Sequence, residues 1–244
     1  MELDRYLDAL TSRTRRELGS SLVAVTLIGS AGAGWFEPEV SDVDVAVVVG
    51  RPLGEASARS LADRLSHSQL PCPARRLELV VYRRDLLADP AWPLPFELNF
   101  NTGEGMADHV GLDPSAEAAH WFLLDLVIAR ERSTPLAGPP LHALLGDIPR
   151  PDVLDALRSA LDWYAEEEPD AAASTLAACR AWQFAEEGEW GSKRDAAEWA
   201  TARLADTGPV HRALTLRGGG TAEFPTHAEA EAVLDRARAA IDAG

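Results

Sequence analysis

Two short apolar segments, with a pair of acids at the start of the second, constrain this chain more than any other feature. Leu22–Ile28 and Val43–Val49 are rich in Val, Ile and Leu and have the length of buried strands. Asp42 and Asp44 flank the first residue of the second segment. Because side chains alternate along a strand, the two carboxylates point to the same side, roughly 7 Å apart.

Two carboxylates that face one way at the start of an apolar strand are unfavourable unless a positive group lies between them. Mg²⁺ is the natural partner, because it takes oxygen ligands and usually binds together with substrate phosphates. Gly29 and Ser30 follow the first segment. The glycine lets a phosphate approach the backbone, and the serine adds a hydroxyl and a free N–H. The pattern therefore predicts a magnesium and phosphate site.

A third carboxylate, Glu78, lies in the middle of the apolar segment 76–82. The pattern resembles the nucleotidyltransferase superfamily built on the polymerase-β palm. Its parts are a turn of Gly and Ser, a spacer, an Asp-x-Asp pair and a later acid on a strand. In the alternative interpretation, Glu78 faces solvent from an edge strand.

Composition is typical of a soluble globular protein, with 46% hydrophobic and 25% charged residues in 244. The sequence contains no apolar run long enough for a transmembrane helix. Its first residues favour an amphipathic helix over a secretory signal, so we expect a cytoplasmic protein. Cys72 and Cys179 are too few for a disulfide framework or a thiolate zinc site, and we expect both to be reduced.

The formal charge of −16 argues against nucleic acid as a partner, because binding to phosphate backbones depends on Lys and Arg. An acidic cleft attracts cations instead, so a polycationic small substrate fits the charge. The acids gather in the second half of the chain, where they also fit an alternative interpretation as solvated helix faces.

Periodicity predicts a mixed domain followed by a helical one. We expect a helix at 2–18, strands at 22–29, 43–49 and 76–82, a possible strand at 97–100, and helices at 54–67 and 115–131. The prolines between 135 and 151 indicate a connection between domains. Beyond it we expect helices at 152–165, 170–187, 193–205, 209–216 and 227–242. The expected fold is α+β: a mixed sheet with helices in 1–150, and an all-α helical bundle in 151–244. A cleft between the two is the default substrate site.

A motif in the helical half narrows the resemblance. An Arg-x-Trp at Arg180–Trp182 is followed by Gly188 and then by the segment Lys193–Ala200, which reads KRDAAEWA. This spacing resembles the C-terminal domain of the streptomycin and spectinomycin adenylyltransferases. Together with the N-terminal patterns, the resemblance extends from about residue 20 to 205.

The resemblance implies ATP-dependent transfer of AMP to a hydroxyl of an aminoglycoside-like molecule, with release of pyrophosphate. It also implies roles for particular residues. For Glu78 it leaves open whether the residue is the base, a metal ligand or both. The triphosphate would be bound by Gly29, Ser30, Ser41, Arg180 and Lys193. The Mg²⁺ ligands would be Asp42, Asp44 and Glu78. The base that takes the proton from the hydroxyl would be Glu78. Domain 151–244 would close the cleft for ATP and the acceptor.

The acceptor side departs from that family. A tryptophan after the base strand and a polar residue near the start of a helix help to seat the antibiotic there. The corresponding positions hold Gly103 and Ala173, while the acid at Asp170 is kept as a substrate contact. The adenylyl-transfer residues are therefore present, but the acceptor pocket differs, and the acceptor stays open.

Two alternatives to this interpretation remain. The first is an adenylyltransferase that acts on a different small molecule. The second is a non-catalytic regulator, such as an antitoxin, with a nucleotidyltransferase-like fold. We expect a monomer with ATP, Mg²⁺ and a cationic small molecule as partners, and neither nucleic acid nor membrane.

Overall fold

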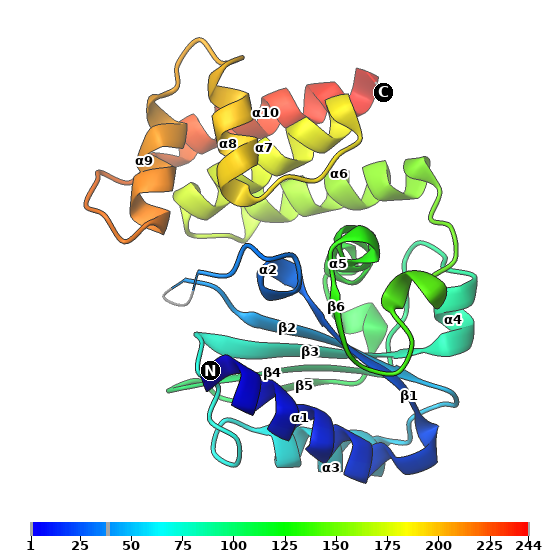
Figure 1. Cartoon of the computed structure of the whole chain (residues 1–244). Coiled ribbons are helices and arrows are strands. Elements are labelled where there is room, and N and C mark those ends of the chain that lie inside the picture. The colour runs from blue at the N-terminus through cyan, green and yellow to red at the C-terminus, as the bar shows by residue number, and fades with distance from the viewer. Residues whose placement is uncertain (1, 38–39, 244) are drawn as a thin grey trace. The chain divides into compact units, whose positions relative to one another are not determined.

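The computed structural model describes residues 2–37 and 40–243. The chain divides into two compact units, Met1–Pro149 and Arg150–Gly244 (Figure 1). The first contains a mixed sheet with helices, and the second is helical throughout its regular structure. The expected α+β fold class is thus confirmed.

The first unit is built on a six-stranded sheet in the order β5-β4-β3-β2-β1-β6. Only β2 and β3 pair in parallel among the described strands, because helix α3, Glu55–Leu65, carries the chain back between them. The strands are β1 (Leu22–Ile28), β2 (Val43–Val49), β3 (Arg76–Arg83), β4 (Leu98–Gly103), β5 (His109–Gly111) and β6 (Thr134–Ala137).

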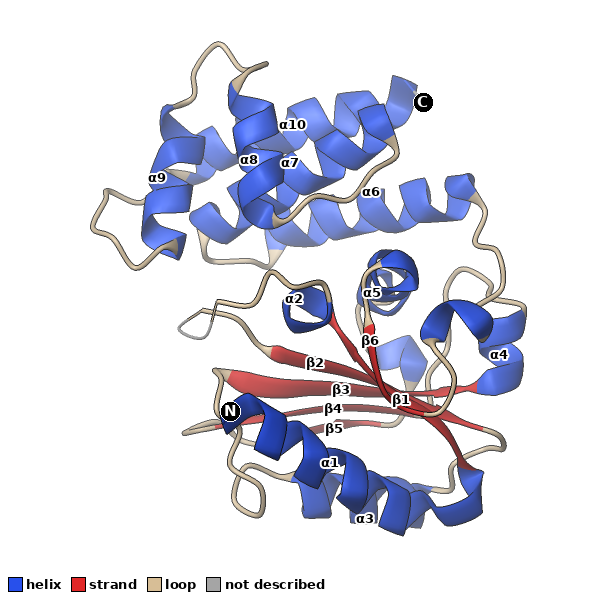
Figure 2. Cartoon of the chain, in the orientation of Figure 1, coloured by secondary structure: helices blue, strands red, loops and turns tan. Residues whose placement is uncertain are grey.

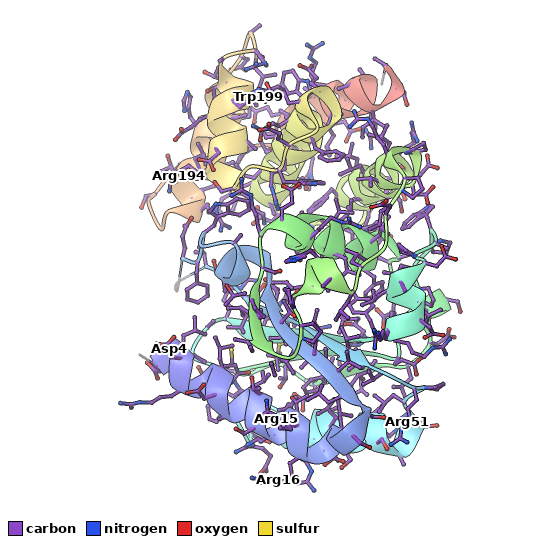
Figure 3. All side chains as sticks on the ribbon, turned by 45° about the vertical axis from the view of Figure 1, so that its right-hand side comes forward. Asp4, Arg15, Arg16, Arg51, Arg194 and Trp199 are labelled. Atoms are coloured by element: carbon purple, nitrogen blue, oxygen red, sulfur yellow. The ribbon has the colours of Figure 1, made fainter. Side chains whose placement is uncertain are left out.

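One face of the sheet is apolar and covered by two helices. Every second residue of the central strands, such as Val45 and Leu79, joins a buried cluster with residues of α3 and of α1, Glu2–Leu18. Figure 2 shows both helices on the same side of the sheet. Three charged residues of α1, Asp4, Arg15 and Arg16, are exposed along its outer edge (Figure 3). This face supplies the core of the unit.

The opposite face carries the polar residues and lies beneath other helices. These are α2 (Gly29–Gly32), α4 (Arg84–Ala88) and α5 (His120–Glu131), which Figure 2 shows across the sheet from α1. The phenolic hydroxyl of Tyr82 on β3 donates to the Phe122 carbonyl of α5 at 3.3 Å, which ties this helix to the sheet. Asp44 and Glu78 belong to this face, since their strand neighbours on both sides are in the apolar cluster.

The sequence interpretation was wrong at two places in this unit. Residues 134–137, read as part of a connection between domains, form the edge strand β6, where Pro135 is tolerated because an edge strand leaves one backbone side unpaired. The helix expected at 115–131 begins at His120, after a short 3-10 turn at Pro114–Ala116. Short 3-10 turns also occur at Gly19–Ser21 and Leu141–Ala143.

The second unit packs its helices through small side chains. Helix α7 has the most extensive contacts, with α10 above all, and buries Ala178, Cys179 and Ala181. Such residues let helix backbones approach closely, as the alanine enrichment predicts. The helices are α6 (Arg150–Glu166), α7 (Ala171–Glu187), α8 (Lys193–Thr201), α9 (Gly208–Arg217) and α10 (His227–Ala243). Across the described residues, the structure has no helix with the length and hydrophobicity of a membrane span.

Candidate active site

Asp44 and Glu78 are brought together by the register of the two parallel strands. Asp44 of β2 pairs directly with Glu78 of β3, and both side chains lie on the polar face. The two carboxyl groups share a hydrogen bond. Two carboxylates in such contact repel each other when both are ionised, and this repulsion adds to burial in raising the pKa of Asp44.

Gly29 packs directly against this pair. Its φ of +59° lies in the left-handed region, and a Cβ at this position would overlap the Asp44 carboxylate. Ile28, the residue before it, pairs with Asp44 across β1 and β2. The turn between β1 and α2 therefore requires glycine for two reasons, its backbone angle and the space that the carboxylate fills.

Burial and like charges raise the pKa values of both carboxyl groups. For Asp44, burial is the main cause, and the carboxylates of Glu78, Asp125 and Asp42 add to it. For Glu78, burial again raises the pKa, while the Arg76 guanidinium opposes the rise and Asp42 adds to it. The site thus concentrates more negative charge than its own cations neutralise.

Asp42 lies just before β2 and contacts two arginines. Its Oδ1 is 3.3 Å from Arg75 Nε, and its Oδ2 is 3.3 Å from Arg76 Nε. Arg76 also reaches Glu78, with 2.5 Å between Nη2 and Oε1. Within residues 2–37 and 40–243, no three potential ligand side chains form a preassembled metal cluster. Arg76 therefore occupies the space between two of the three predicted metal ligands.

The donor set nevertheless fits Mg²⁺. Asp42 Oδ1 is buried and accepts no hydrogen bond from the described part of the chain. The Arg75 guanidinium is 3.3 Å from this oxygen but donates no hydrogen bond to it, so the oxygen is available as a ligand for a divalent cation. Carboxylate oxygens are also the ligands that this hard cation prefers. Asp42, Asp44 and Glu78 could thus hold Mg²⁺ once Arg76 moves aside.

The two serines predicted at the phosphate site differ in their surroundings. Ser30 is partly buried in α2, next to Gly29, and its carbonyl accepts from the Trp35 N–H at 2.8 Å. Ser41 is buried, and its hydroxyl accepts from the Glu37 N–H at 3.0 Å. In this conformation, Ser41 fixes the loop before β2, and Ser30 is the more accessible of the two.

In the second unit, the structure places Arg180 beside the loop that precedes Lys193. Arg180 Nε donates to the Gly191 carbonyl at 3.1 Å, and its guanidinium lies 5.5 Å from the ring centre of Trp190. Lys193 is the first residue of α8, after Ser192, whose hydroxyl and Asp195 form a capping box. The local geometry thus links the two predicted phosphate-binding cations through one short loop.

The predicted acceptor positions also have clear local roles. Asp170 is the N-cap of α7, and its Oδ1 accepts from the N–H groups of Ala172 and Ala173 at 2.9 and 3.3 Å. A Cβ on Gly103 would lie 2.8 Å from the Arg75 carbonyl and 2.9 Å from Arg76 Cβ. Position 103 therefore has no room for the large aromatic residue that the family resemblance would place there.

Three residues of the site were missed in the sequence interpretation. Arg76 was detectable, because it lies two residues before Glu78 on one strand and so shares its face. Asn101 is opposite Glu78 on β4, and its Nδ2 donates to Asn99 Oδ1 at 3.4 Å. Asp125 of α5 raises the pKa values of Asp44 and Tyr82, after burial. It is an acid placed between Leu124 and Leu126 in the apolar part of α5, and that is the one signal of it in the sequence.

Comparison with known proteins gives a consistent result. The family described as "Aminoglycoside adenylyltransferase, C-terminal domain" matches residues 143–241. An aminoglycoside (3'') (9) adenylyltransferase of Klebsiella pneumoniae is 32% identical over 214 residues, which cover 83% of this chain and 80% of the relative. The enzyme of the same name from Shigella flexneri is 30% identical with the same coverage.

A second group of relatives has a narrower name. Spectinomycin 9-adenylyltransferase of Staphylococcus aureus is 32% identical over 193 residues, covering 76% of this chain and 73% of the relative. Among solved structures, a spectinomycin adenyltransferase from Enterococcus faecialis, crystallised with ATP and spectinomycin, superposes with a TM-score of 0.78. It is 19% identical and covers 98% of this chain and 99% of its own, so the whole fold is shared.

Proposed function

This chain belongs to the aminoglycoside adenylyltransferase family, and we propose that it transfers AMP from ATP to a hydroxyl of a small aminocyclitol antibiotic. The observation that carries the proposal is the pairing of Asp44 with Glu78 across two parallel strands, against the Gly29 turn. A base and a metal-binding carboxylate in direct contact are what adenylyl transfer to a hydroxyl needs.

In this reaction, the acceptor oxygen forms a bond to the α-phosphorus of ATP, and the bond to pyrophosphate breaks. Glu78 accepts the hydroxyl proton, because a sugar hydroxyl is a poor nucleophile until a carboxylate takes its proton. Asp42 and Asp44, with Glu78 beside Asp44, would hold Mg²⁺, which when bound would supply charge neutralisation at the phosphates. Gly29 and Ser30 leave backbone N–H groups and a hydroxyl for the triphosphate. Ser41 shapes the adjoining loop and reaches the phosphates when that loop adjusts.

The helical unit, residues 151–244, supplies positive charge to the triphosphate in this proposal. Arg180 and Lys193 are held by the same loop, between Gly188 and Ser192. Transfer of a charged phosphoryl group depends on positioning and charge neutralisation more than on covalent chemistry, so two cations on one rigid support suit the task.

The acceptor that we propose is a compact aminocyclitol of the spectinomycin type. Gly103 cannot carry the large aromatic side chain that helps to seat antibiotics in the family, which reduces the surface available to an elongated aminoglycoside. Asp170 is exposed at the start of α7 and carries a negative charge that suits a cationic acceptor. We place the reaction in the cytoplasm, where ATP is available, and expect the enzyme to act as a monomer.

The acceptor proposal is tested by mixing the protein with ATP, Mg²⁺ and either spectinomycin or streptomycin, and measuring pyrophosphate release. We expect turnover with spectinomycin and at least tenfold lower kcat/KM with streptomycin, which corresponds to about 1.4 kcal/mol of transition-state binding. ATP binding without turnover on any aminocyclitol would indicate an enzyme for a different acceptor. Failure to bind ATP would favour the non-catalytic regulator.

The role of the helical unit is tested by a pair of neighbouring substitutions. Lys193→Ala should weaken ATP binding about tenfold or more, measured by calorimetry, because it removes a cation from the triphosphate. Arg194→Ala is the matched control, since this residue is the next one on α8 and is exposed to solvent (Figure 3). Equal ATP affinity in the two variants would remove Lys193 from the proposed site.

A further inference from the structure

Arg76 is a residue of the site to which the proposed reaction gives no role. It is the first residue of β3, on the face that carries Glu78, and its side chain is 36% exposed. It contacts Glu78 at 2.5 Å and Asp42 at 3.3 Å, so one guanidinium bridges two carboxylates that the proposed function assigns to the metal.

The two contacts of Arg76 differ in hydrogen-bond geometry. Its Nη2 lies at hydrogen-bonding distance from Glu78, whereas its Nε is buried and donates no hydrogen bond within the described residues, although Asp42 is close. The Asp42 oxygen that this Nε approaches is Oδ2, at 3.3 Å. The Asp42 contact is therefore an attraction of charges without hydrogen-bond geometry, and a stronger cation can replace it.

Arg75 provides an internal comparison. Among the described residues its one ion pair is with Asp42, at 3.3 Å, its charge also lowers the pKa of Glu78, and its side chain is 55% exposed. An exposed ion pair of this kind contributes little, because water and salt screen it. Of the two neighbouring arginines, only Arg76 joins Asp42 to Glu78.

We propose that Arg76 is the internal counter-ion of the catalytic carboxylates and competes with Mg²⁺ for Asp42 and Glu78. This inference rests on the metal assignment of the proposed function. In the nucleotide-free protein, Arg76 holds the two carboxylates together and keeps metal affinity low. When ATP binds, its phosphates offer the guanidinium a forked partner, and the carboxylates become available to the metal. Arg76 is thus a positioning residue that makes metal binding depend on nucleotide binding.

The experiment measures binding of Mn²⁺, as a probe for Mg²⁺, by electron paramagnetic resonance. Wild type, Arg76→Met and Arg75→Met are titrated with and without a non-hydrolysable ATP analogue. Without nucleotide, Arg76→Met should bind Mn²⁺ about tenfold or more tightly than wild type, because a positive charge within a few ångströms of the ion is removed. Arg75→Met should differ from wild type by less than about threefold, as expected for an exposed pair. With the analogue, the wild-type affinity should rise more than that of Arg76→Met, because the two ligands are linked through Arg76.

Arg76→Lys separates charge from shape and guards against misfolding. It keeps the positive charge, so its nucleotide-free Mn²⁺ affinity should stay within about threefold of wild type. Equal nucleotide-free affinities in wild type and Arg76→Met would overturn the inference while leaving the proposed function intact. An equal gain in Arg75→Met would overturn it too, since the effect would then come from overall charge. If Mn²⁺ bound to none of the variants even with the analogue, both the inference and the metal assignment would fail.

Discussion

The two faces of the sheet in the first unit share the same strands but serve different purposes. On one face, Val45 and Leu79 are buried in the apolar cluster beneath α1 and α3. On the other, their immediate neighbours Asp44 and Glu78 contact each other and lie in a field of like charge. Because alternation assigns successive side chains to opposite faces, one segment of seven or eight residues can contribute to both stability and chemistry.

The folded state can contain the unfavourable polar face because burial of the apolar face stabilises it. Buried carboxyl groups with raised pKa values are unfavourable in the folded state. The apolar face offsets that cost, since Leu77, Leu79 and Val81 of β3 are each 0% exposed. Changes on the two faces should therefore have opposite effects on activity and stability.

The largest expected effect is on the polar face. Asp44→Asn should lower kcat/KM about a thousandfold or more, because it removes a metal-binding charge next to the base. It should leave thermal stability equal or higher, since like-charge repulsion with Glu78 is relieved. Adenylyl transfer and thermal unfolding are measured on the same preparation.

Asp4→Asn is the matched control for this change. Asp4 is an exposed acid on α1, beside the apolar face, so its loss should change turnover by less than about twofold. Near-normal activity in Asp44→Asn would contradict the assignment of catalysis to the polar face.

The next effect compares neighbours on β3. Leu79→Ala should reduce the free energy of unfolding by about 2–5 kcal/mol, because it leaves a cavity in the apolar cluster. Val80→Ala, on the opposite face, should cost less than about 2 kcal/mol, since Val80 is only partly buried. Urea unfolding measures both; equal losses would mean that the polar face also carries core packing.

A smaller effect concerns pH and the helix that covers the polar face. Burial lowers the pKa of His120, the first residue of α5, to about 4. The folded protein therefore keeps this ring neutral, while the unfolded chain binds a proton below a pH of about 6.5. The unfolded state binds more protons between these values, so the contribution of His120 to stability falls as pH decreases from about 6.5 to 4.

This contribution is measured as the difference between wild type and His120→Phe at a pH of about 7 and about 5. Wild type should lose about 2 kcal/mol relative to the variant on acidification. A difference is needed because Asp44 and Glu78, whose pKa values are raised, take up protons in the folded state and stabilise it at low pH. A constant difference between the two proteins would show that the ring titrates normally.

The sequence predicts the separation of the faces but not how they are assembled. Alternation places Asp44 opposite Val43 on one strand and Glu78 opposite Leu77 on another. The two acids meet on one face only if these strands are adjacent. Adjacency depends on the crossover through α3, which is a property of topology. The fold class was predictable because apolar periodicity is local, and the pairing gained support only from the resemblance to a family.

Residues that reach the site from elsewhere were not predictable in the same way. Asp125 comes from α5, and its position depends on how that helix docks on the sheet. Strand β6 was missed because Pro135 signals a break in sequence, although an edge strand accepts it. Arg76, in contrast, is predictable from alternation alone, because it lies two residues before Glu78 on the same strand.

The smallest predicted effect tests whether polarity on the second face matters away from the carboxylates. Thr26 of β1 lies on that face, between Val25 and Leu27 of the apolar cluster, and is 0% exposed. Its hydroxyl has no hydrogen-bond partner among the described residues. Thr26→Val keeps the shape and removes an unsatisfied polar group, so it should stabilise the protein by up to about 1 kcal/mol, measured by urea unfolding. Turnover should stay within about twofold of wild type, because the change is small and lies away from the paired carboxylates. A loss of activity larger than that would extend the functional part of the polar face from Asp44 and Glu78 along the sheet to β1.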